Sequence, residues 1–131
     1  MIDDIFGQLE HRYNFYKYEN INLFGKDYKV KIVVENDETN TILDIQRNNY
    51  KEYFKYINEN KDKIINLIKQ YFLDVYNVEI NIDKDLRAQT IYFARNGEWG
   101  ILFDTTIDEE NGFAVFVKDE KLYIGTQDMF I

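Results

Sequence analysis

The spacing of apolar residues changes twice along this chain of 131 residues. From Tyr28 to Val34, apolar side chains alternate with lysines, and this period of two predicts a half-buried strand. From Thr41 to Tyr76, apolar side chains recur every three or four residues, which predicts helix. Beyond residue 90 alternation returns. The order strands, helices, strands predicts an α+β fold with an antiparallel sheet of about five to seven strands.

The helical region is too long to be one helix within a domain of this size. An unbroken helix over 41–76 would extend about 54 Å, whereas a globule of this length is about 36 Å across. Asn58-Glu59-Asn60 interrupts the apolar pattern. We therefore predict two helices, roughly 41–58 and 60–76, with Thr41 and Asn60 as N-caps, packed on one face of the sheet. No Pro-, Gly- or Ser-rich linker divides the chain, so 1–131 is predicted to be one domain.

Short turn sequences predict how the strands are connected. Residues 78–82 alternate and predict one further short strand. The strongest turn signal is Asn96-Gly97, typical of a two-residue type I′ turn, and this register places Phe93 opposite Gly100. Three hairpins are predicted in all: 21–24 with 28–34, 91–95 with 98–103, and 113–118 with 121–125.

The composition excludes several kinds of chemistry. The chain has no cysteine, which excludes disulfides, thiolate nucleophiles and cysteine zinc sites, and its one histidine, His11, is not placed in a catalytic motif. The net charge of −8 disfavours nucleic-acid binding unless the lysines and arginines cluster. The N-terminus has no basic or apolar leader, and no apolar run reaches the roughly 20 residues of a membrane span. We expect a cytoplasmic protein without a cofactor and without contact to nucleic acid or membrane.

The stretch "TTIDEENGF", followed by "GTQD" near the C-terminus, resembles a pattern found in small, acidic, largely uncharacterised bacterial domains. Those domains carry a Trp-Asp-x-Glu-His-Gly turn and then a strand that ends in Gly-x-x-Asp. Ile107 stands at the tryptophan position and Asn111 at the histidine position, so this chain lacks the residue of that turn best suited to proton transfer. The resemblance extends to the 22–35 hairpin and the helix with Gln46 and Tyr50, and some such domains are similar to immunity proteins encoded beside toxins. The positions that match are Asp108, Glu110, Gly112 and Gly125.

The favoured hypothesis is a non-catalytic protein-binding module, in particular an immunity protein that neutralises a basic toxin. An acidic balance raises the association rate with a basic partner, and tyrosine is enriched at protein interfaces. The same residues also fit ordinary sheet core and a solvated turn, so both interpretations stay open. The candidate binding residues are Tyr16, Tyr18, Trp99, Asp108, Glu109 and Glu110.

Two alternatives belong to other functional classes. The first is a carboxylate- or metal-dependent hydrolase, which requires Asp104, Asp108, Glu110 and Asp128 to converge in one pocket. The second is a structural module that associates with itself, because exposed strand edges favour homodimers.

Overall fold

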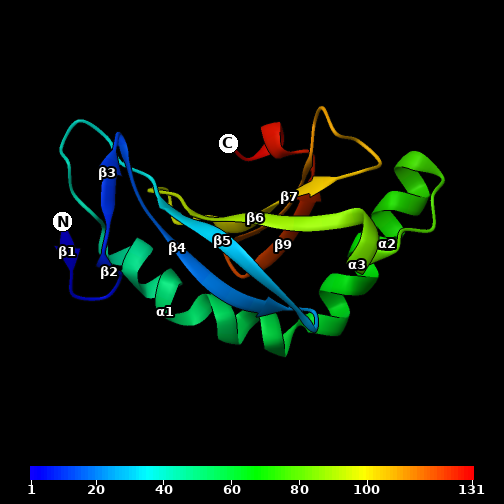
Figure 1. Cartoon of the computed structure of the whole chain (residues 1–131), viewed down its shortest axis with the longest axis horizontal. Helices are drawn as coiled ribbons and strands as arrows, with labels where there is room; N and C mark the ends of the chain where they lie inside the picture. The colour runs from blue at the N-terminus through cyan, green and yellow to red at the C-terminus, as the bar shows by residue number, and fades with distance from the viewer.

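The computed structural model describes all 131 residues and contains a seven-stranded sheet with two long helices on one of its faces (Figure 1). The sheet strands, in spatial as in chain order, are β3 (Glu10–Arg12), β4 (Asn14–Leu23), β5 (Lys26–Val34), β6 (Leu86–Phe93), β7 (Trp99–Thr105), β8 (Phe113–Lys118) and β9 (Lys121–Gly125). The helices are α1 (Asp44–Glu59), α2 (Lys61–Tyr76) and the short α3 (Ile82–Asp85). The termini add a two-stranded sheet, β1 (Ile2–Asp3) with β2 (Gly7–Gln8), and a 3₁₀ turn, η1 (Gln127–Met129).

The α+β composition with two long helices is confirmed, but the prediction of a purely antiparallel sheet is wrong. β5 and β6 are parallel neighbours, with Ile32 opposite Ile91, and all other pairs in this sheet are antiparallel. The reason is the path of the chain in Figure 1, where α1 carries it back along the length of the sheet before β6 begins. A strand that starts at the same end as β5 must run parallel to it.

α1 begins later than its predicted N-terminus, whereas α2 begins at Lys61, directly after the predicted N-cap Asn60. Residues 41–43 stay extended, and the carbonyl of Thr41 accepts a hydrogen bond of 2.5 Å from the Arg95 guanidinium instead of starting a helix. Asn60 separates α1 from α2 and occupies the N-cap position of α2, as predicted, but its side chain makes no cap bond to α2 and donates instead to the carbonyl of Tyr56 in α1 (2.9 Å). The strand predicted over 78–82 is absent, because Asn81 accepts the N–H of Lys84 (3.1 Å) and initiates α3.

The hairpin between β6 and β7 is shifted by one residue from the predicted register. The turn has three residues, closed by the N–H of Ala94 bonded to the carbonyl of Glu98 (2.9 Å), with Gly97 at φ 93°. Phe93 therefore lies opposite Trp99, and their rings stack at 6.4 Å on the face that the helices cover. A shift of one residue decides which side chains face the core, so burial of Trp99 outweighs the preference of Asn96-Gly97 for a two-residue turn. The ring of Phe116, not Phe93, covers Gly100.

The main core lies between the sheet and the two long helices. α2 contributes Ile64, Ile68 and Phe72, which are at most 1% exposed. The opposite side of the sheet, here called the outer face, carries a smaller apolar cluster around Phe116, on which the ring of Phe130 stacks at 4.5 Å. In Figure 1 the C-terminal turn thus lies across the sheet from α1. None of the helices is both long and apolar enough to cross a membrane.

The N-terminal segment is fixed to α1 by an ion pair between Asp3 and Arg47 (2.8 Å). Burial alone would raise the pKa of Asp3, but hydrogen bonds from Arg47 and from the backbone N–H groups of Phe6 and Ile5 lower it below its ordinary value. Ionised Asp3 therefore stabilises the fold above its unfolded pKa of about 3.9, and this contribution disappears as the pH falls through the lower folded pKa.

Replacing Asp3 with asparagine is expected to lower the free energy of unfolding by about 1–2 kcal/mol at pH 7 and to weaken its dependence on pH below about pH 5. Urea unfolding from pH 3 to pH 7 measures both effects. Asp4→Asn is the matched control, because Asp4 is exposed. Identical pH profiles for the two variants would show that the Asp3–Arg47 pair contributes nothing.

Candidate functional site

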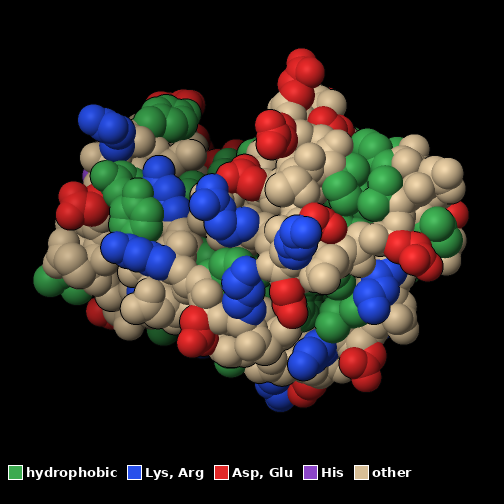
Figure 2. All heavy atoms as spheres, turned by 45° about the vertical axis from the view of Figure 1, so that its right-hand side comes forward, with side chains coloured by type: hydrophobic (Ala, Val, Ile, Leu, Met, Phe, Trp, Pro, Cys, Tyr) green, Lys and Arg blue, Asp and Glu red, His purple; other side chains and the backbone are tan.

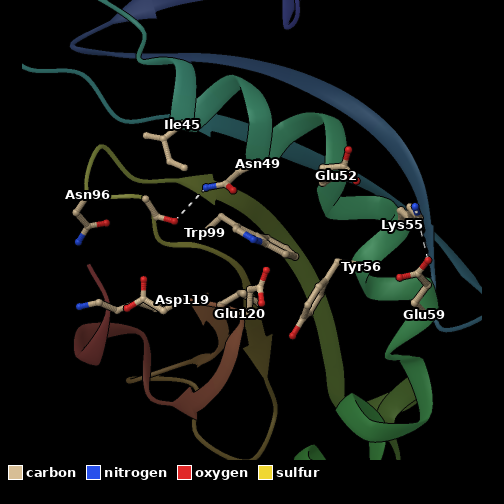
Figure 3. A pocket seen from close by; sticks show the side chains of 13 residues that line it. Ile45, Asn49, Glu52, Lys55, Tyr56, Glu59, Asn96, Trp99, Asp119 and Glu120 are labelled. Atoms are coloured by element: carbon tan, nitrogen blue, oxygen red, sulfur yellow. Dashed lines mark hydrogen bonds and ion pairs between the residues drawn. The ribbon is translucent and has the colours of Figure 1, made fainter.

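A groove of about 540 Å³ separates α1 from the turns that join β6 to β7 and β8 to β9 (Figure 3). We call it the α1 groove. α1 supplies one wall and Asn96, Gly97 and the 118–120 turn supply the other. Asn49 donates a hydrogen bond of 3.0 Å to the carbonyl of Gly97 and holds the two walls together at one end. The groove is therefore formed within the folded chain and needs no partner to assemble it.

The floor of the groove is aromatic. Trp99, the only tryptophan, is 6% exposed and packs edge to face against Tyr56, with ring centroids 5.6 Å apart. Tyr53 supports Trp99 from the core side at 6.1 Å. Burial, and secondarily the charge of Glu120, raises the pKa of Tyr56, so its phenol stays neutral at physiological pH. Neutral aromatic rings attract cations through their faces.

The rim of the groove is acidic. Glu52 and Glu59 come from α1, and Asp119 and Glu120 come from the β8–β9 turn. The two lysines on the rim are engaged: Lys55 lies 3.9 Å from Glu59, and Lys118 lies 3.5 Å from Glu98. The carboxylates of Glu52, Asp119 and Glu120 form no ion pair. In Figure 3 the side chain of Glu120 lies between Trp99 and Tyr56 at the edge of the floor.

The backbone of the β8–β9 turn is strained. Asp119 and Glu120 have φ values of 51° and 64°, so both lie in the left-handed region of a two-residue hairpin turn. Asn-Gly is the preferred sequence for this type of turn. Any other residue with a Cβ raises the conformational free energy by about 1 kcal/mol or more when its backbone lies in the left-handed region. Strain of this kind occurs at functional sites, although the turn geometry alone assigns no function.

The structure places the sequence-predicted binding residues in three separate regions. Trp99 forms the floor of the α1 groove. Tyr16 and Tyr18 lie on the outer face, where Tyr18 is 57% exposed. The acidic loop with Asp108, Glu109 and Glu110 follows the C-terminal end of β7, whereas Trp99 begins that strand. A strand of this length separates its two ends by about 20 Å, so the loop and the groove are distinct places.

Asp108 has a structural role in its own loop. It accepts hydrogen bonds from the hydroxyl of Tyr76 (2.7 Å) and from the side-chain amide of Asn111 (3.1 Å). These bonds, led by that from Tyr76, lower the pKa of Asp108 and keep it ionised. The loop is thereby tied to the end of α2, with Glu109 and Glu110 exposed to solvent.

Three of the carboxylates named by the hydrolase alternative are bonded to separate partners within the chain. Asp104 pairs with Arg87 (3.3 Å), Asp108 is held by Tyr76, and Asp128 accepts from the hydroxyl of Thr126 (2.5 Å). No group of three or more histidine, aspartate or glutamate side chains is arranged to hold a metal ion. The groove beside β6 and β7 is lined by Asp104 but not by Asp108, Glu110 or Asp128, so the hydrolase alternative stays a prediction without a pocket to support it.

Sequence reasoning missed Glu52, Tyr56 and Glu120. On α1, Glu52 looks like any solvent-facing residue of an amphipathic helix, and nothing local connects it with a turn near residue 120. The only available signal was a turn of two acidic residues where glycine is usual. Comparison with protein-family models, with curated proteins and with solved structures finds no match to this chain.

Proposed function

We propose that this chain is a non-catalytic protein-binding module that takes a basic segment of a partner protein into the α1 groove. In particular, we propose that it acts as an immunity protein whose partner is a basic bacterial toxin. One observation carries it: three carboxylates without ion pairs, Glu52, Asp119 and Glu120, surround an aromatic floor. An arginine or lysine side chain needs this combination, because its stem packs on aromatic surface while its charged head meets a carboxylate.

The energetics also favour binding through this groove. Packing fixes the backbone of both walls, so binding needs no rearrangement of the groove and costs only the ordering of the exposed carboxylate side chains, about 0.5–1.5 kcal/mol each. Water leaves the aromatic floor as the side chain enters, which strengthens the charge interaction. The net charge of −8 adds long-range attraction for a basic partner and accelerates association at low ionic strength.

Hexa-arginine is a suitable probe, because Trp99 is the only tryptophan and its emission reports directly on the groove floor. We expect a saturable change in emission, with an affinity that falls as the salt concentration rises. The double variant Glu52→Gln with Glu120→Gln should bind about tenfold more weakly, because two charge-assisted contacts become neutral.

The matched control is Glu109→Gln with Glu110→Gln, which removes the same charge from the loop at the other end of β7. This variant should bind hexa-arginine nearly as tightly as the wild type, apart from a small effect of net charge. If the loop variant loses more affinity than the groove variant, the binding site lies at residues 108–110. If the wild type gives no saturable change, the proposal fails. Self-association through the free edges of β3 and β9 stays a separate prediction, for which gel filtration is the measurement.

A further inference from the structure

We propose that the outer face of the sheet is a second binding surface, which takes an extended acidic peptide segment through Lys29 and Lys31 and the tyrosines beside them. This surface lies on the side of the sheet opposite to the core that α1 and α2 cover. It is thus independent of the α1 groove, and either site can fail its test without affecting the other.

Lys29 and Lys31 reach the outer face because β5 alternates. Val30, Ile32 and Val34 are fully buried against the helices, so the residues between them point the other way. The Nζ atom of Lys29 lies 5.4 Å from the ring centroid of Tyr18, and that of Lys31 lies 4.5 Å from the ring centroid of Tyr16.

The two ammonium groups are available to a ligand. Neither lysine forms an ion pair within the chain. Three acidic side chains lie nearby: Asp27 accepts from Asn22 (2.9 Å), Glu35 accepts from the hydroxyl of Tyr92 (3.1 Å), and exposed Glu10 lies opposite Tyr16 with Arg12 two residues along the same strand. In Figure 2, Lys and Arg side chains lie among hydrophobic ones on the visible surface, with Asp and Glu side chains between them. Two ammonium groups without ion pairs, next to each other and to tyrosine rings, favour an anionic ligand at this point of the surface.

The spacing of the two lysines favours an extended peptide. Residues two apart on one strand are separated by about 6.8 Å, and the same repeat separates alternate side chains of an extended peptide. Carboxylates at positions i and i+2 of such a peptide therefore meet Lys29 and Lys31 together. Because each ammonium group already rests on a tyrosine ring, binding costs less side-chain entropy than it does for a free lysine.

The overall charge favours a short acidic peptide over a single-stranded nucleic acid. A peptide with two or three carboxylates contacts only the basic surface, and charges beyond about 8 Å are screened at physiological salt. A nucleic-acid strand would carry its phosphates past this surface to the acidic remainder of the chain. Repulsion from a net charge of −8 then opposes binding.

The test is fluorescence anisotropy with a labelled peptide of alternating aspartate and threonine. We expect saturable binding to the wild type and about tenfold weaker binding to Lys29→Gln with Lys31→Gln. The control, Lys51→Gln with Lys63→Gln, makes the same charge change on exposed positions of α1 and α2 and should keep the wild-type affinity to within about twofold. The single variant Lys29→Gln, at an exposed position, should also weaken peptide binding, but by less. It replaces the double variant in the test if the double variant does not fold.

Three results would overturn this proposal. The peptide fails to bind the wild type, or the two double variants weaken binding equally. In the third, an oligothymidine binds in preference to the peptide and depends on Lys29 and Lys31, which would assign the surface to nucleic acid.

Discussion

Replacing Phe72 with alanine is expected to lower the free energy of unfolding by about 3–5 kcal/mol, a large share of the 5–15 kcal/mol typical of a domain. Phe72 is fully buried in the C-terminal half of α2 and packs on Phe113 of β8, with ring centroids 4.9 Å apart. It also stacks on Tyr76 at 5.4 Å. Removal of the ring leaves a cavity between helix and sheet, since both are held by many other contacts and cannot close around it.

Leu73→Ala is the matched control, because Leu73 is the next residue of α2 and is 44% exposed. It should cost less than about 1 kcal/mol in urea unfolding monitored by circular dichroism. Equal losses for the two variants would mean that α2 does not pack on the sheet through Phe72.

Replacing Gln46 with leucine is expected to cost about 3 kcal/mol, although leucine is apolar and similar in size. Gln46 is fully buried, and its side-chain amide donates to the carbonyls of Glu35 (2.9 Å) and Phe93 (3.0 Å). Its carbonyl accepts the N–H of Leu43 (2.9 Å) at the start of α1. Leucine would remove three hydrogen bonds at about 1 kcal/mol each: it would leave the carbonyl of Glu35 and the N–H of Leu43 without partners, while the carbonyl of Phe93 would keep only the N–H of Glu35 (3.0 Å).

The control for this variant is Gln70→Leu on the exposed surface of α2, where the side chain bonds only to Asp74. Its expected cost is a few tenths of a kcal/mol. If Gln46→Leu unfolds at the wild-type urea concentration, the link that Gln46 makes between α1 and the ends of β5 and β6 is not needed for stability.

Local sequence patterns predicted those parts of the fold that depend on neighbouring residues. The alternation from Tyr28 to Val34 correctly identified β5 and its buried face. The hairpin across Asp119-Glu120 has its predicted strand bounds, because turn and strands are contiguous in sequence. The break at Asn60 followed from comparing the length of a single helix with the size of the globule.

The remaining features depend on contacts between distant segments. The parallel pairing of β5 with β6 is set by the path of α1 and α2, which no local pattern encodes. The Asn96-Gly97 turn fits two loop lengths, and only the packing of Trp99 beneath α1 selects between them. For the same reason the α1 groove could not be found from sequence, since it joins Glu52 to a turn nearly 70 residues away.

The most direct test of the proposed function is the NMR signal of the Trp99 indole N–H in ¹⁵N-labelled protein titrated with hexa-arginine. One tryptophan gives one indole resonance, so the groove floor has its own probe. We predict that this resonance shifts saturably, and that the shift is lost in Glu52→Gln with Glu120→Gln. The opposite result, a stationary indole resonance while the backbone amides of Glu109 and Glu110 shift, would place the basic segment at the far end of β7 and contradict the proposed site.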